Sequence, residues 1–221
     1  SSDVCSSDLY LHETQKSDLS HMNSITPYVT DKYMLIDSSS RRNLELVETL
    51  REKQKRGSLL WVLDKTRTAM GARLLRSYVE QPLIDEDEIN ARLDAVEALT
   101  GQAMIREEIR EYLRPVYDLE RLVGRISYQS ANPRDLIAFK SSLQMLPYIK
   151  QLLNSFDGDA LAQIQEDLDP LEDLYQLVDA AIVDDPPYLM RDGGMIKDGY
   201  NETVDNYRHA KTDRKSTRLN S

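Results

Sequence analysis

The sequence has little cysteine, histidine and glycine. Its 221 residues include one cysteine, three histidines and eight glycines. A single cysteine excludes an intramolecular disulfide framework, and so few soft ligands argue against a zinc site. The longest apolar runs are about five residues, whereas a membrane-spanning helix needs about 20. These shortages predict a globular protein of a reducing compartment, with no transmembrane segment.

Charge is unevenly distributed along the chain. The totals of 28 Lys/Arg and 38 Asp/Glu give a net charge of −10, and residues 156–205 alone hold 14 acids against two bases. This balance argues against a protein that grips nucleic acid over its whole surface. Residues 41–76, however, carry ten bases and four acids. This stretch could be a nucleic-acid face, but we favour the simpler interpretation that its bases line the solvated side and exit turn of an amphipathic helix.

The two ends of the chain have neither the periodicity nor the caps of the interior. Residues 213–221 can be encoded by GAT CGG AAG AGC ACA CGT CTG AAC TCC, and one frame of its reverse complement encodes Ser-Ser-Asp-Val-Cys-Ser-Ser-Asp, which is residues 1–8. The string resembles a sequencing-library adapter. We therefore predict that residues 1–9 are a foreign leader and residues 214–221 a foreign tail, to be set aside in reasoning about the fold. Codons incompatible with a shared inverted sequence would refute this.

The interior reads as one helix after another, which predicts a mainly α, multi-helix domain with at most a short strand or hairpin. Asn132-Pro133-Arg134-Asp135 is a strong helix start, because it combines an N-cap, a proline at the first position and an acid in the first turn. The expected elements are an extended segment at 33–37, a helix from 38–40 to about 57 with Leu44, Val47 and Leu50 on its apolar stripe, helices over 68–81, 85–101, 105–115 and 119–126, a helix over 132–153 kinked at Pro147, two shorter helices within 161–183 divided near Asp169-Pro170, a turn with a short hairpin or loop over 191–199, and a helix from Tyr200.

No residue can be assigned to catalysis, to a cofactor or to a metal. The Walker phosphate-binding pattern is absent, since Gly193-Gly194 and Gly199 lack the following Lys-Ser/Thr. No histidine has a Glu three residues before it, as a carboxylate metal site in a helical bundle would need. Trp61 lies close to several Lys and Arg residues, but its apolar neighbours favour a core anchor over a base-stacking platform.

Several segments together resemble the core (lever) domain of the MutS family of DNA mismatch repair proteins. They occur in the family's order over roughly residues 10–213. Two positions depart from the family pattern, Ala69 where proline is common and Tyr78 where tryptophan is frequent. The segments are Leu35-Ile36-Asp37-Ser38-Ser39-Ser40-Arg41-Arg42-Asn43-Leu44-Glu45-Leu46, Leu63-Asp64-Lys65-Thr66, Met70-Gly71-Ala72-Arg73-Leu74-Leu75-Arg76, Gln81-Pro82-Leu83, Asp118-Leu119-Glu120-Arg121-Leu122 with Arg125-Ile126, Asn132-Pro133-Arg134-Asp135-Leu136, and Gly193-Gly194-x-Ile196-x-x-Gly199-Tyr200-Asn201.

The resemblance implies that residues 10–30 are the end of a connector region and residues 31–213 the helical core, with Tyr200 beginning a long lever helix. It implies a cytoplasmic, homodimeric, DNA-dependent ATPase that clamps double-stranded DNA with mismatches or small loops and acts with a downstream factor of the MutL type. ATP and Mg²⁺ are expected only in an ATPase domain outside this sequence. The fragment itself is expected to hydrolyse no ATP and to show no preference for mismatched over matched duplex.

Packed helices move as rigid bodies, so a helical domain between an ATPase and a clamp can relay the state of each. Pairs between elements are expected at Arg41, Arg42, Arg134 and Asp135. Two alternatives stay open from sequence: a MutS-like paralogue acting in recombination, and a helical protein-interaction module with no DNA role.

Overall fold

The computed structural model describes the backbone of residues 32–156, 158–188 and 190–219. It describes side chains over the same ranges up to residue 210, except for Met190. The predictions for residues 1–9 and 10–30 lie outside the described residues. The unit that contains the described helices runs from Tyr33 onward.

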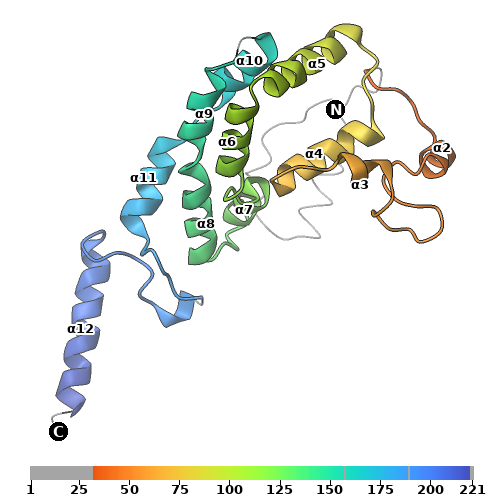
Figure 1. The fold of residues 1–221 in the computed structure, drawn as a ribbon. Coiled ribbons are helices and arrows are strands. Elements are labelled where there is room, and N and C mark those ends of the chain that lie inside the picture. Colours follow the sequence, from red (N-terminus) through yellow and green to blue (C-terminus); the bar gives the residue numbers. More distant parts are fainter. Residues whose placement is uncertain (1–31, 157, 189, 220–221) are drawn as a thin grey trace, which may run out of the picture. The chain divides into compact units, whose positions relative to one another are not determined.

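Helices follow one another along almost the whole of this unit, which confirms the mainly α class (Figure 1). They are α2 Ser38–Asn43, α3 Leu59–Leu63, α4 Ala69–Glu80, α5 Glu86–Gly101, α6 Ala103–Leu113, α7 Leu119–Ser127, α8 Pro133–Leu143, α9 Leu146–Leu153, α10 Asp159–Asp167, α11 Glu172–Ala181 and α12 Glu202–Leu219, with a 3-10 turn at Met190–Asp192.

Short polar side chains begin many of these helices by accepting hydrogen bonds from otherwise unpaired backbone N–H groups. Asn132 starts α8 with a full capping box, in which its side chain accepts from the Asp135 N–H and the Asp135 carboxylate accepts from the Asn132 N–H, with Pro133 at the first position. Asp85 likewise accepts from the Glu88 N–H at the start of α5. Both starts were predicted from the sequence and are confirmed.

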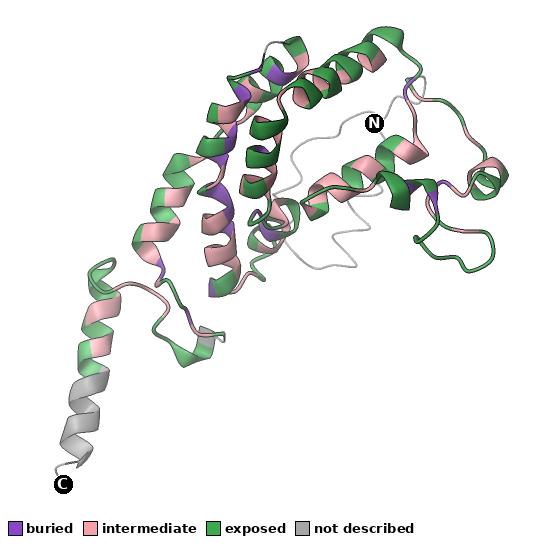
Figure 2. Ribbon diagram, viewed as in Figure 1, coloured by how far each residue is buried: buried purple, intermediate pink, exposed green. Residues whose placement is uncertain are grey.

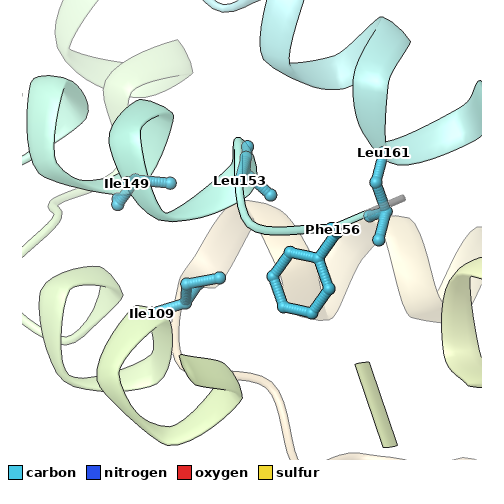
Figure 3. Close-up of a cluster of buried hydrophobic side chains, with 5 residues drawn as sticks. All are labelled: Ile109, Ile149, Leu153, Phe156 and Leu161. Carbon is cyan, nitrogen blue, oxygen red and sulfur yellow. The ribbon is translucent and has the colours of Figure 1, made fainter. Parts of the chain in front are cut away.

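One buried cluster joins α5, α6, α9 and α10. Ile109 of α6, Ile149 and Leu153 of α9, Phe156 in the turn after α9, and Leu161 of α10 converge on it (Figure 3). Ala95, Ala98 and Leu99 of α5 pack against its edge. Because α5 contacts α6 and α10, and α9 contacts both α6 and α10, these four helices share one apolar interior.

A second buried cluster joins α7, α8 and α9. It consists of Leu122, Phe139, Leu143 and Leu146, and Tyr175 of α11 packs against it. Leu143 is 1% exposed. Figure 2 shows the buried positions running along α8 and α9. Since α11 packs along α8, α8 is covered by helices on several sides.

The predicted helix from 38–40 to about 57 is wrong. Helix α2 ends at Asn43, its cap is Asp37, and Glu45 and Lys53 have φ angles of 50° and 49°, outside the helical region. The Leu59 and Leu60 N–H groups donate to the carbonyls of Glu45 and Leu46. Leu46, and not the predicted stripe, is the buried leucine of this segment. Backbone pairing with the start of α3 therefore overrides the local helical pattern.

The prediction of one helix over 132–153 with a kink at Pro147 is also wrong. Helix α8 ends at Leu143, and α9 begins at Leu146 with Pro147 in its first turn. Pro147 has no N–H to donate to the Leu143 carbonyl, and it is favoured in a first turn, where no intrahelical partner is required. The chain therefore breaks over Gln144 and Met145.

Trp61 is not the core anchor that its apolar neighbours predicted. Its exposed fraction is 48%, whereas that of Leu60 is 3%. Helix α3 has only five residues, so it buries one narrow face and leaves Trp61 outside.

Strand-like pairing is limited to isolated bridges in the part of the chain that the structure describes. Tyr33 pairs with Leu83, and Ile182 pairs with Ile196. The predicted extended segment and the short hairpin correspond to these two bridges. Among the described residues, no helix is long and apolar enough to cross a membrane.

Candidate functional site

No metal or catalytic constellation is found among the described residues. No group of three His, Cys, Asp or Glu side chains there is placed to hold a metal ion. An open groove between α5 and α10 is lined by Asp87, Asp94 and Asp159, and none of its described lining residues is a cation or a nucleophile of the Ser, Thr or Cys type. His209 is exposed on α12. Several hydrogen bonds and ion pairs between separate elements gather instead at the junction of α8, α11 and α12.

The junction is built on a short hairpin. The Val183 N–H donates to the Met195 carbonyl at 3.0 Å, and the Lys197 N–H donates to the Ala181 carbonyl at 2.8 Å. Gly193 and Gly194 turn the chain with φ angles of 72° and 74°, which side chains other than glycine rarely adopt. The hairpin therefore carries the chain from the end of α11 to the start of α12 along a defined path.

Lys140 attaches this hairpin to α8. Its Nζ donates to Asp184 Oδ1 at 2.9 Å and to Asp179 Oδ1 at 3.1 Å, and its side chain is only 12% exposed. The hydrogen bond to Asp184 raises the pKa of Lys140, against the opposing effect of burial, and the same bond lowers the pKa of Asp184. A largely buried cation shared by two carboxylates holds the end of α11 and the start of the hairpin together.

Two further cations complete the attachment. Lys197 Nζ donates to the Asp179 carbonyl at 2.6 Å, so it ties the second arm of the hairpin to α11. Arg134, in the first turn of α8, donates to the Pro186 carbonyl at 3.2 Å and lies 5.8 Å from the centre of the Tyr188 ring. Both ends of α8 thus contact the segment that leads to α12.

Arg208 fixes the first turns of α12 to the hairpin. Its Nη2 donates to the Ile196 carbonyl at 2.6 Å, and its Nη1 pairs with Asp198 and with Asp205. The Asp205 carboxylate also accepts from the Gly199 N–H at 2.8 Å. One guanidinium therefore connects α12, the loop before it and the hairpin, with a rigid planar fork that a lysine could not reproduce.

Together these contacts form a polar chain from α8 through α11 and the hairpin to α12, in which the backbone of Ile196 and Lys197 joins the contact of Lys197 to that of Arg208. Its links are Lys140, Asp179, Lys197 and Arg208. The described part of α12 has no broad helix-to-helix packing comparable to that of α8 with α11. The direction of α12 relative to α8 therefore depends on hydrogen bonds and ion pairs at its base.

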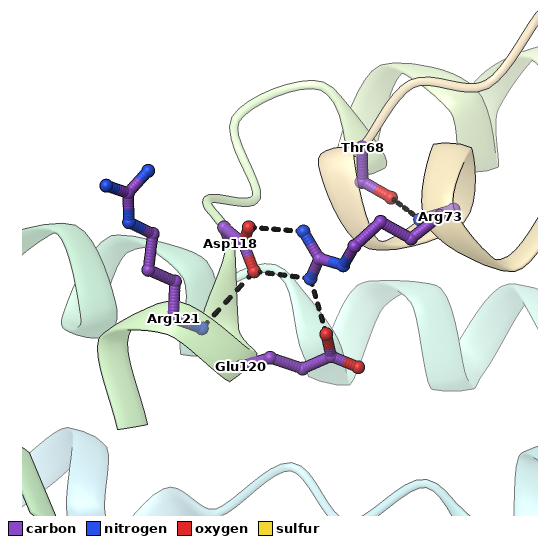
Figure 4. Close-up of polar contacts among 6 residues, drawn as sticks. Thr68, Arg73, Asp118, Glu120 and Arg121 are labelled. Carbon is purple, nitrogen blue, oxygen red and sulfur yellow. Dashed lines mark hydrogen bonds and ion pairs between the residues drawn. The ribbon is translucent and has the colours of Figure 1, made fainter. Parts of the chain in front are cut away.

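A second polar joint connects α4 to the start of α7 (Figure 4). The Arg73 guanidinium donates to both oxygens of Asp118, at 2.6 and 2.8 Å, and also pairs with Glu120. Asp118 caps α7 by accepting from the Arg121 N–H. The bond from Arg73 lowers the pKa of Asp118. This joint fixes α4 to α7, and α7 contributes Leu122 to the second buried cluster.

The sequence identified only part of these joints. Arg134 and Asp135 do make pairs between elements, since Asp135 binds Arg125 of α7 at 2.8 Å. Arg41 instead donates locally to the Ile36 carbonyl. The roles of Lys140, Arg208 and Arg73 were missed, because their partners lie up to 47 residues away or on a hairpin whose register the sequence does not show.

Comparison with known proteins gives a consistent family match. The family model described as MutS domain III matches residues 39–219. The DNA mismatch repair protein MutS of Lachnoclostridium phytofermentans is 64% identical over 206 residues, which is 93% of this chain and 22% of the relative. Those of Acetivibrio thermocellus and Clostridium botulinum are 51% and 47% identical, each over 93% of this chain. The chain thus spans less than a quarter of the length of these relatives.

Proposed function

Since the chain belongs to the MutS domain III family, we propose that it acts as the helical lever of a longer DNA mismatch repair protein. In this role it couples the ATP-dependent states of that protein to the clamping of mismatched DNA. The observation that carries the proposal is the junction at the base of α12, where Lys140 and Arg208 connect the lever helix to α8 and α11.

Exposed apolar side chains support a place within a larger protein. Leu93 and Val96 of α5 are 58% and 59% exposed, and Met104 at the start of α6 is 89% exposed. Leu93 and Val96 are three positions apart and so lie on the same side of α5, and exposed apolar surface of this kind is typical of an interface. The relatives are more than four times longer than the matching segment, so we expect other domains to cover these faces.

The mechanism that we infer is rigid-body transmission. Packed helices have few discrete arrangements, so a push on α8 or α11 is passed on as a change in the direction of α12. The polar chain at the hairpin keeps the angle between α8 and α12 fixed when α8 or α11 is pushed. The joint of Arg73 and Asp118 does the same for α4 and α7.

The ATPase activity, the partners and the location are part of the proposal. Within the part of the chain that the structure describes, Gly193 and Gly194 form the turn of the hairpin, and no Lys-Ser/Thr follows them as in a phosphate-binding loop. We therefore assign nucleotide binding to another domain. Mismatched or looped duplex DNA, a second copy of the protein and a factor of the MutL type are the proposed partners, in the cytoplasm.

The relatives reported above are all named as mismatch repair proteins, which disfavours both a recombination paralogue and an interaction module with no DNA role.

A chimera tests the lever proposal. Residues 39–210 would replace the matching segment of the Lachnoclostridium phytofermentans protein, and the chimera would be expressed in a bacterial strain that lacks MutS. We expect the mutation frequency to fall toward that of the repair-proficient strain, and ATP to release the chimera from a mismatched duplex. A chimera that is stable and binds the mismatch, but neither lowers the mutation frequency nor responds to ATP, would refute the proposal.

A further inference from the structure

The basic loop, residues 51–56, is an exposed segment between α2 and α3 that the lever proposal does not use. Its sequence, Arg-Glu-Lys-Gln-Lys-Arg, has four bases, one acid and no apolar residue. All six residues are exposed. The interpretation of these bases as the solvated side of an amphipathic helix no longer applies, because the segment is not helical.

The backbone around the loop is held in place by hydrogen bonds. The Thr49 N–H donates to the Gln54 carbonyl at 2.9 Å, and the Lys53 N–H donates to the Thr49 carbonyl at 3.1 Å. Ser58, itself buried, donates through its hydroxyl to the Lys55 carbonyl at 2.7 Å. The bases are thus presented on an ordered turn, which lowers the entropy cost of binding a ligand there.

Most of this positive charge is unpaired within the described part of the chain. Lys55 pairs with Asp64 and lowers the pKa of that carboxyl to about 2. Arg51, Lys53 and Arg56 form no ion pair with any described residue. In a chain of net charge −10, three neighbouring unpaired bases mark a surface suited to an anionic partner.

We propose that the basic loop binds the sugar-phosphate backbone of duplex DNA without regard to sequence or mismatch. A phosphate backbone presents dense negative charge and is bound mainly through Lys and Arg. An acidic protein partner fits the loop less well, because stable protein interfaces have an apolar centre and the loop offers none. The loop would give the protein a DNA contact that does not depend on the lever junction.

Trp61 provides a built-in reporter for this contact. It is the only tryptophan of the chain and is half-exposed. The Ser58 hydroxyl, which donates to the Lys55 carbonyl, also accepts from the backbone N–H of Trp61. A ligand seated on the loop is therefore expected to change the emission of Trp61.

The test titrates the 221-residue chain with a matched 20-base-pair duplex and follows anisotropy of the labelled DNA together with Trp61 emission. Three contacts predict that raising the salt from about 50 to about 200 mM weakens binding about 40-fold. The triple variant Arg51→Gln/Lys53→Gln/Arg56→Gln should bind at least about 10-fold more weakly at the lower salt. The slope of the logarithm of its affinity against the logarithm of the salt concentration should be shallower by about three. A duplex with one mismatch should bind equally well.

A matched control neutralises the same number of bases elsewhere. Arg106→Gln/Arg114→Gln/Arg121→Gln changes the net charge equally and should leave most of the affinity intact. The proposal is overturned if both triple variants weaken binding equally, if the loop variant binds like the unsubstituted chain with unchanged circular dichroism, or if a 20-residue poly-glutamate binds the loop while the duplex does not. None of these results bears on the chimera that tests the lever, so either proposal can be refuted while the other still holds.

Discussion

Replacing Arg208 by alanine tests whether the polar junction, and not helix packing, holds the base of α12. The substitution removes a 2.6 Å hydrogen bond to the Ile196 carbonyl and two ion pairs. A hydrogen bond from a charged group contributes about 1.5–3 kcal/mol when shielded from water, but the Arg208 side chain is 30% exposed. Its pair with Asp198 adds little, because that carboxylate is 94% exposed and exposed pairs contribute at most about 1 kcal/mol.

The expected loss is therefore about 1–2 kcal/mol in the free energy of local opening, which corresponds to about a 5- to 30-fold fall in protection from hydrogen exchange. The fall should be confined to amides in the first turns of α12 and to the hairpin amides of Val183 and Lys197. Amides in α6 and α9 should keep their protection, because the first buried cluster is untouched. Exchange measured by NMR or mass spectrometry resolves these regions.

Two substitutions provide controls for this measurement. His209→Ala changes an exposed neighbour on the same helix and should leave the hairpin amides unaffected. Asp198→Asn should cost less than half as much as Arg208→Ala, because Asp198 is the more exposed partner. If Arg208→Ala leaves the protection of α12 and the hairpin unchanged, or lowers it equally in α6 and α9, the polar junction does not hold the base of α12.

Three other predictions concern the buried core and two of the ion pairs. Leu143→Ala should lower the free energy of unfolding by about 2–5 kcal/mol, because Leu143 is 1% exposed; a loss below about 1 kcal/mol in urea denaturation would contradict the assigned core. A double-mutant cycle of Arg73→Ala and Asp118→Ala should show favourable coupling, since the two residues share two hydrogen bonds, and strictly additive losses would rule out the joint. In the folded chain the pKa of Asp64 is about 2, below the ordinary 3.8, because of its pair with Lys55. The pair should therefore add up to about 1 kcal/mol to the free energy of unfolding above pH 4, and this contribution should be lost as the pH falls toward 2. If Lys55→Gln still lowers the free energy of unfolding by the same amount at pH 2, this reasoning is refuted.

Local sequence patterns are enough to predict the class of the fold and many of its helix boundaries. Helical periodicity and N-caps such as Asn132 and Asp85 depend on residues three or four positions apart, so they are visible in a linear sequence. The ordered motifs also predicted the family, which the match over residues 39–219 confirms. The failure at residues 38–57 has a specific cause: the apolar spacing there suits a helix, but the carbonyls of Glu45 and Leu46 pair with α3 instead.

The packing of the helices against one another sets which side chains are buried and which cations act as joints. Trp61 and Leu60 are adjacent and both apolar, yet packing leaves one exposed and buries the other. Lys140 and Arg208 look like ordinary helix-surface bases in the sequence. Their partners are brought to them by the packing of α11 on α8 and by the register of the hairpin. Contacts between residues 40 or more positions apart depend on how whole helices pack, and no local pattern of residues encodes that packing.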